Sequence, residues 1–234
     1  MSGYYDKINL KFAKGDKGQM FSVIFDMDGT LLDTQSICVP AWEYAGKMQG
    51  ISGVGDHISR VCGMNEVGWT AYLEQNFGEM DIELFKKTMR EYIIENGKVT
   101  YKKGAEALLS FLKENGIPLA LASGSSHKTI EHHLNEVGAT DIFSVIVGGK
   151  DVENGKPAPD IFLLAAQKLG VNPADCFVIE DSENGIRAGY SAGMKCIGIP
   201  DVASFSDEVK ALMTAHLSSL DEAIEIFENV IKEA

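Results

Sequence analysis

Short, continuously apolar runs recur along the chain and predict buried β-strands. They are rich in β-branched residues and do not alternate between apolar and polar positions. This pattern is typical of parallel strands that helices cover on both faces of a sheet. The five runs span residues 21–25, 117–123, 144–148, 176–180 and 195–200.

Helical patterns separate these runs. Within residues 104–115, Leu108, Leu109 and Leu112 recur on one helical face, and Gly116 follows as a stop signal. The alternation of strands and helices predicts a doubly wound, Rossmann-like α/β fold with a parallel sheet, which binds ligands at the carboxyl ends of its strands. Similar patterns predict helices over residues 127–137, 160–169 and 184–192.

Residues 34–98 break this rhythm, because they carry helical patterns and no convincing strand. Ile82, Phe85 and Met89 share one face of a predicted helix, and Pro40 suits the first turn of another. The stretch predicts a small helical domain, the cap, inserted after the first strand. The expected segments are an N-terminal extension (1–19), the α/β core (20–33 and 99–234) and the cap (34–98).

The composition narrows the choice of partners. A net charge of −13 disfavours nucleic acid and anionic membranes, and no run of 18 apolar residues or signal-peptide pattern is present. Four widely spaced cysteines indicate a reduced, intracellular protein. We therefore expect a cytoplasmic protein that binds a small ligand. The oligomeric state is open, with a monomer as the first expectation.

Two acidic residues, Asp26 and Asp28, follow the first strand. Residues i and i+2 of an extended chain point to the same side, so both carboxylates would face one site. Two close carboxylates repel each other unless one is protonated or a cation lies between them. An ordinary turn at Asp28–Gly29 is the alternative interpretation.

The fourth strand ends in a second acidic pair, Glu180 and Asp181. Neighbouring parallel strands would bring the two pairs together. Such a cluster of hard oxygen ligands suits Mg²⁺. Asp181–Ser182 could instead cap the next helix, but that alternative accounts for only one of the two pairs.

Groups that could bind an anion follow the second and third strands. Ser123, Gly124, Ser125 and Ser126 lie at the start of a predicted helix, where they offer hydroxyl and backbone N–H groups to a phosphate. An ordinary serine N-cap remains the alternative. Lys156 precedes Pro157 in a stiff loop that could hold one ammonium at the same edge of the sheet, although most lysines are only solvated.

Taken together, four motifs resemble those of the haloacid dehalogenase superfamily, in its phosphatase and phosphomutase branch with a helical cap. They stand in the expected order along residues 20–232. The motifs are DMDGT from Asp26, the serine of LASGS at Ser123, the lysine of GKPAPD at Lys156, and the ED of VIEDSENG at residues 180–181.

The resemblance implies a mechanism. Asp26 would be the nucleophile that forms an aspartyl-phosphate, and Asp28 the general acid and base. Mg²⁺ would be held by the side chains of Asp26 and Asp181 and the backbone carbonyl of Asp28, with Glu180 as a direct or water-mediated ligand.

The same resemblance implies a set of groups that bind the phosphoryl oxygens. Ser123 and Lys156 would contribute side chains. The backbone N–H groups of Met27, Asp28 and Gly124 would complete the set.

The function implied is a Mg²⁺-dependent phosphatase that hydrolyses a small phosphorylated metabolite, with a sugar phosphate as the first expectation. A β-phosphoglucomutase-type isomerase and a non-catalytic phosphometabolite-binding protein are the alternatives. Such a mutase carries a histidine where this chain has Cys38, and basic cap residues where it has Cys62 and Glu66, so the phosphatase is favoured. Further polar candidates, each also interpretable as structural or solvated, are His57, Arg60 and His127.

Overall fold

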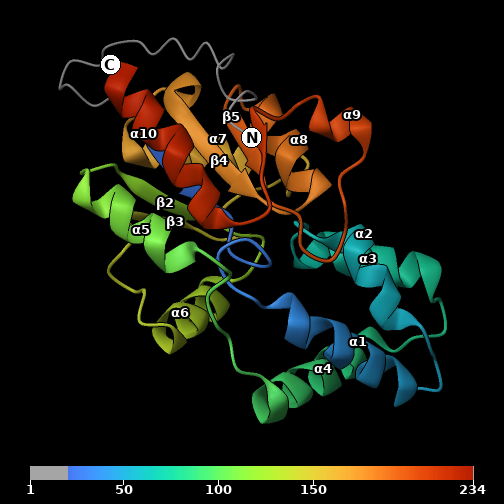
Figure 1. Cartoon of the computed structure of the whole chain (residues 1–234). Helices are drawn as coiled ribbons and strands as arrows, with labels where there is room; N and C mark the ends of the chain where they lie inside the picture. The colour runs from blue at the N-terminus through green and yellow to red at the C-terminus, as the bar shows by residue number, and fades with distance from the viewer. Residues whose placement is uncertain (1–20, 234) are drawn as a thin grey trace.

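The computed structural model describes residues 21–233, so the predicted N-terminal extension (1–19) lies outside the described residues. A six-stranded, wholly parallel sheet forms the centre of the core (Figure 1). Its strands lie in the order β3-β2-β1-β4-β5-β6. Their bounds are Ser22–Phe25 (β1), Leu119–Ala122 (β2), Val145–Val147 (β3), Cys176–Glu180 (β4), Lys195–Gly198 (β5) and Ala215–His216 (β6).

Both faces of the sheet are apolar because successive side chains of a strand point to opposite sides. In β1, Val23 and Phe25 join the hydrophobic cluster on one face, and Ile24 joins the cluster on the other. The first cluster includes side chains of α5 (Ala105–Glu114), α6 (His127–Glu136) and α10 (Ala223–Glu233). The second includes side chains of α7 (Asp160–Leu169), α8 (Glu183–Ser191) and α9 (Asp207–Lys210). The predicted doubly wound α/β fold is confirmed.

The predicted helical cap is also present. Residues 34–98, all of which the structure describes, contain helices and no strand. They form a unit below the core in Figure 1, with a hydrophobic cluster of their own around Trp42, Leu73 and Phe85. The boundaries after residues 33 and 98 stay a prediction. The helices are α1 (Gln35–Lys47), α2 (Ile58–Val61), α3 (Glu66–Asn76) and α4 (Ile82–Asn96), with short 3₁₀ helices at Val54–His57 in the cap and at Pro173–Asp175 and Leu220–Glu222 in the core.

The chain crosses between core and cap twice, and the two crossings are hydrogen-bonded to each other. The Asp33 N–H donates to Thr100 O at 2.8 Å, and the Lys102 N–H donates to Leu31 O at 2.9 Å. These bonds hold the loop after β1 against the second crossing.

Two details differ from the sequence prediction. Pro40 lies inside α1 rather than in its first turn, because the helix already begins at Gln35. The last strand, β6, was not predicted, because its two residues are too short to form a recognisable apolar run. All four cysteines are free thiols in this structure. No helix within residues 21–233 is both long and apolar enough to span a membrane.

Candidate active site

The carboxyl ends of β1 and β4 bring three acidic side chains together. The two strands pair in parallel with Phe25 opposite Ile179, and the Asp26 N–H donates to Ile179 O at 3.0 Å. One carboxylate oxygen each of Asp26, Glu180 and Asp181 lies within 4.8 Å of the others, and all three residues are buried. The two acidic pairs were predicted to lie together, and the structure brings three of the four carboxylates together.

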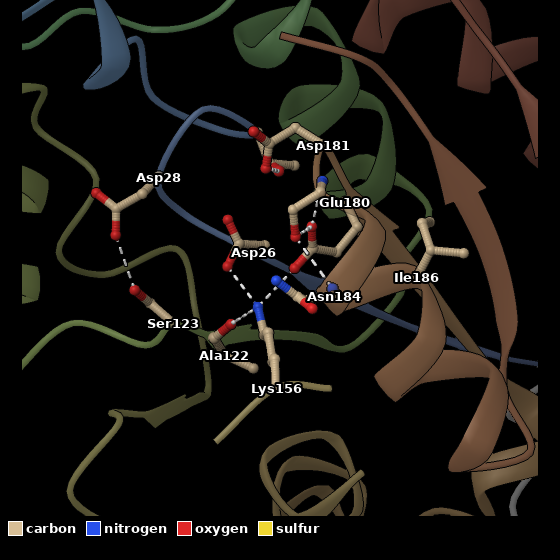
Figure 2. Close-up of polar contacts among 12 residues, drawn as sticks. Asp26, Asp28, Ala122, Ser123, Lys156, Glu180, Asp181, Asn184 and Ile186 are labelled. Atoms are coloured by element: carbon tan, nitrogen blue, oxygen red, sulfur yellow. Dashed lines mark hydrogen bonds and ion pairs between the residues drawn. The ribbon is translucent and has the colours of Figure 1, made fainter. Parts of the chain in front are cut away.

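Lys156 lies between two of these acids. Its ammonium donates hydrogen bonds of 2.6 Å to Asp26 Oδ1 and to Glu180 Oε1, and one of 3.2 Å to Ala122 O (Figure 2). The Lys156 side chain is 1 % exposed, so these contacts replace its hydration. Lys156 thus reaches the same edge of the sheet as the acidic pairs.

Burial and charge set the protonation of the cluster. Burial, with the charges of Glu180 and Asp28, raises the pKa of Asp26 to about 8, against the opposing effect of the Lys156 ammonium. Burial and the neighbouring Glu180 and Asp26 likewise raise the pKa of Asp181. Although burial alone would lower the pKa of Lys156, the two carboxylates beside it raise that pKa overall. With one ammonium beside three buried acids, Asp26 and Asp181 therefore resist ionisation unless a further cation lies beside them.

Glu180 is tightly held by donors. Its Oε1 accepts from Lys156, and its Oε2 accepts from both the backbone N–H and the hydroxyl of Ser182, each at 2.8 Å. Both oxygens are therefore engaged within the protein. Glu180 serves in this arrangement as an anchor for the lysine and for the first turn of α8.

Asp181 is positioned by the loop that follows β1. The Thr30 hydroxyl donates to Asp181 Oδ1 at 3.0 Å. Gly29 adopts a φ of +85°, and an ideal Cβ at this position would lie only 2.4 Å from Asp181 Oδ2. Only glycine combines this backbone conformation with so close an approach. The turn considered at Asp28–Gly29 is therefore present, whereas no local pattern singled out Thr30.

Asp28 is separate from the buried cluster. It is half-buried, and Figure 2 shows its carboxylate turned away from Asp26 toward Ser123. The hydroxyls of Ser123 and Ser125 both donate to Asp28 Oδ2, at 3.0 and 2.8 Å. The expected common site thus has two compartments, one around Asp26 and one around Asp28. Ser125, predicted only as a donor to phosphate, is here a partner of Asp28.

The serine-rich loop after β2 combines both of its predicted uses. Ser126 is the N-cap of α6 and accepts from the Thr129 N–H at 3.3 Å. Ser123 and Ser125, in contrast, face Asp28. The N-cap interpretation therefore applies to Ser126, while the two preceding hydroxyls lie at the candidate site.

The donor set fits a divalent cation. Three carboxylate oxygens lie within 4.8 Å of one another, and burial disfavours the charged forms of Asp26 and Asp181 without a cation. Hard oxygen donors of this type suit Mg²⁺, which keeps several waters and one or two carboxylates in its coordination shell. Asp26 and Asp181 are the candidates to hold it, since both oxygens of Glu180 already accept hydrogen bonds.

A cap loop, residues 62–65, lies over this edge of the sheet. The Asn184 side chain of α8 donates to Cys62 O at 3.0 Å. An ideal Cβ at Gly124 would lie 2.7 Å from Met64 O, so the cap loop packs directly on the serine-rich loop. The cap is therefore closed over the core in this structure.

Cys38 and Cys62 also lie near the candidate site. Burial raises the pKa of the Cys38 thiol to about 12, and the Asp28 charge adds to the effect. Burial and the acidic cluster, Asp181 first, raise the pKa of Cys62 as well. Both side chains are therefore uncharged thiols near neutral pH. They do not supply the proton transfer of a histidine or the charge of a basic residue.

The other polar cap candidates are either paired within the cap or exposed to solvent. Glu66 pairs with Lys86 at 3.0 Å. His57 Nδ1 lies 2.7 Å from the Tyr72 hydroxyl, within the cap. Arg60 is exposed on α2. These three residues fit the structural or solvated interpretation.

His127, on the core, pairs with Asp151: its Nε2 lies 2.7 Å from Asp151 Oδ2. Asp151 Oδ2 also accepts from the Gly148 N–H at 3.0 Å. His127 therefore belongs to a local contact between α6 and the loop after β3.

Comparison with known proteins assigns this fold and site to a class. The family model for haloacid dehalogenase-like hydrolases matches residues 22–193. The chain belongs to this family. The predicted class, a phosphoric monoester hydrolase of the haloacid dehalogenase type, is confirmed.

Individual relatives cover most of the chain. A phosphorylated carbohydrates phosphatase of Thermotoga maritima is 34 % identical over 224 residues, which cover 92 % of this chain and 99 % of that protein. The beta-phosphoglucomutase of Bacillus subtilis is 35 % identical over 190 residues, covering 77 % and 83 %. The crystal structure of a beta-phosphoglucomutase from Clostridium difficile aligns with a TM-score of 0.74 at 27 % identity, covering 92 % of this chain and 98 % of that one.

Proposed function

We propose that this protein is a Mg²⁺-dependent phosphatase that hydrolyses a small phosphorylated metabolite of the sugar-phosphate class. The observation that carries the proposal is the difference between the surroundings of two carboxylates. Asp26 lies in the buried cluster beside Lys156, whereas Asp28 lies outside it with two serine hydroxyls. A nucleophile and a proton donor need such different surroundings.

In the first step, a carboxylate oxygen of Asp26 attacks phosphorus and the ester P–O bond breaks. Asp28 donates its proton to the leaving alkoxide, which departs as the alcohol. In the second step, Asp28 takes a proton from water, the water oxygen attacks phosphorus, and the bond to Asp26 breaks. Inorganic phosphate leaves, and both carboxylates regain their initial states.

The remaining groups bind and orient the phosphoryl group. Ser123, Lys156 and the backbone N–H groups of Met27, Asp28 and Gly124 would contact its oxygens. A Mg²⁺ ion held by the Asp26 and Asp181 side chains and the Asp28 carbonyl would supply charge neutralisation. The closed cap would keep bulk water away during transfer.

The sugar-phosphate class is supported by the relative from Thermotoga maritima, which is named for phosphorylated carbohydrates. The mutase relatives make isomerisation the second candidate. A mutase must protonate and reorient a bisphosphate under the cap, and this chain has an uncharged thiol, Cys38, where such a mutase has a histidine. Hydrolysis is therefore favoured.

A panel of phosphorylated metabolites, including aldose 1-phosphates, ketose 1-phosphates and hexose 6-phosphates, tests the proposal. Each is incubated with Mg²⁺ or with a chelator and assayed for free phosphate and for isomerised product. The proposal predicts phosphate release that needs Mg²⁺. Isomerisation of an aldose 1-phosphate with a bisphosphate primer, at a rate above phosphate release, would support the mutase. No turnover of any member would support a binding protein.

A further inference from the structure

Asp201 lies in the loop after β5, outside the acidic cluster already described. Its Oδ1 accepts a hydrogen bond of 2.6 Å from the Lys102 ammonium, and the two side chains are 14 % and 23 % exposed. The Lys102 N–H in turn donates to Leu31 O in the loop after β1. The Asp201 carboxylate is thereby fixed beside the loop that also positions Asp181.

The second oxygen of Asp201 is buried and has no hydrogen-bond partner among the described residues. A buried acceptor without a donor costs free energy, so a native structure normally supplies one. The direction in which this oxygen points shows where the donor belongs. An ideal Cβ at Gly29 would lie 3.0 Å from Asp201 Oδ2 and 2.4 Å from Asp181 Oδ2, so both oxygens approach the same Cα.

A direct bond from Asp201 to a shared cation does not fit this geometry. The carboxylate oxygens that lie within 4.8 Å of one another are those of Asp26, Glu180 and Asp181, without Asp201. A water molecule between Asp201 and the cation would supply the donor that this oxygen lacks among the described residues. Mg²⁺ keeps several of its waters, and those waters are strong hydrogen-bond donors.

We propose that Asp201 is a positioning residue for the cation, whose Oδ2 accepts a hydrogen bond from a water molecule on a Mg²⁺ ion held by Asp26 and Asp181. Lys102 fixes the carboxylate through its other oxygen. The inference rests on the proposed function, because it needs a cation at the acidic cluster. It adds a residue that lies far from both acidic motifs in the sequence.

The test is isothermal titration of metal-free protein with MgCl₂, which needs no substrate and no turnover. Asp201→Asn keeps the shape of the side chain and an oxygen for Lys102, but it cannot present two acceptors. We expect its Kd for Mg²⁺ to rise roughly tenfold, the lower end of the effect of such outer contacts on metal affinity. Asp207→Asn removes the same charge from a fully exposed position on α9 and should leave the Kd within twofold.

A second variant separates cation positioning from a purely structural ion pair. Lys102→Met breaks the pair but leaves both Asp201 oxygens in place, so we expect its Kd to rise less than that of Asp201→Asn. Circular dichroism checks that each variant is folded. An unchanged Kd for folded Asp201→Asn, or an equal or larger rise for Lys102→Met, overturns the inference alone. Failure of the unchanged protein to bind Mg²⁺ overturns the proposed function as well.

Discussion

The ammonium of Lys156 lies 2.6 Å from Asp26 Oδ1, with the two side chains only 1 % and 5 % exposed. This contact joins the loop after β3 to the end of β1. It places a fixed positive charge beside the proposed nucleophile. Because the pair is buried, its removal has consequences for stability as well as for catalysis.

Lys156→Met is expected to lower the free energy of unfolding of metal-free protein by about 3–5 kcal/mol, the cost of leaving a buried charge without its partner. Excess Mg²⁺ should restore part of this loss, since a cation would again neutralise the carboxylates. Denaturant unfolding with and without Mg²⁺ measures both effects.

Lys232→Met is the matched control, because it removes an exposed lysine 3.2 Å from Glu228. Such exposed pairs contribute little to stability. If the free energy of unfolding falls by the same small amount in both lysine variants, the buried ion pair does not contribute to stability as proposed.

Gly29→Ala is expected to disturb both the backbone and Asp181. The φ of +85° penalises any side chain, and the added Cβ would lie 2.4 Å from Asp181 Oδ2. Gly50→Ala is a control for the first effect alone, since Gly50 has a φ of +77° and open space around it. Gly50→Ala should lower the free energy of unfolding by about 1–2 kcal/mol. Gly29→Ala should lower it by more, because the added Cβ also meets Asp181.

The two glycine variants also differ in their expected metal binding. Gly29→Ala should weaken the binding of Mg²⁺ because Asp181 must move, whereas Gly50→Ala should bind as the unchanged protein does. Equal Mg²⁺ affinities for both variants would show that Asp181 can shift without loss and would argue against its role as a ligand.

Asn184→Ala removes the hydrogen bond from α8 to the cap loop at Cys62 O. One such bond contributes about 1 kcal/mol, so kcat/KM for the best substrate of the panel should fall roughly fivefold if cap closure limits the reaction. Asn76→Ala is the control, because Asn76 donates to Tyr72 O within its own cap helix. A kcat/KM equal to that of the control would mean that this bond does not stabilise the closed cap.

His133 makes stability depend on pH. Burial lowers its pKa below the ordinary value, despite the nearby charges of Asp28 and Glu136, and its buried Nδ1 has no partner among the described residues. As the pH falls below about 6.5, the unfolded chain binds a proton that the folded protein resists, so the free energy of unfolding falls.

The variant His133→Gln should therefore lose less stability than the unchanged protein between pH 7.5 and 5.5. His132→Gln, from a 67 % exposed position on the same helix, should behave as the unchanged protein. Urea unfolding at the two pH values gives the comparison. An equal loss of stability in both variants would remove His133 as a source of the acid sensitivity.

The parts of the site that the sequence predicted share a physical basis. Asp26, Ser123 and Glu180 directly follow or end buried apolar strands, and parallel strands place their carboxyl ends at one edge. Lys156 was predicted from a stiff loop after the third strand. These positions follow from the period of the apolar pattern and from local chain stiffness.

Other contributors depend on contacts between distant segments. Thr30 and Asp201 reach the site through the packing of loops, which no local pattern records. The strand β6 is similar, because its two residues pair with β5 only once the sheet has assembled. Pro40 was misplaced because α1 begins at Gln35, directly after Thr34, and so before the turn that contains the proline.

The central claim is that Asp26 carries the phosphoryl group during hydrolysis. The rate of phosphate release by Asp26→Asn and Asp26→Ala, measured with saturating Mg²⁺ and the best substrate of the panel, tests it most directly. The mechanism predicts a loss of at least about 1000-fold for both folded variants, as for other enzymes that lose a nucleophile. Phosphate release within tenfold of the unchanged protein by either variant would contradict the assignment.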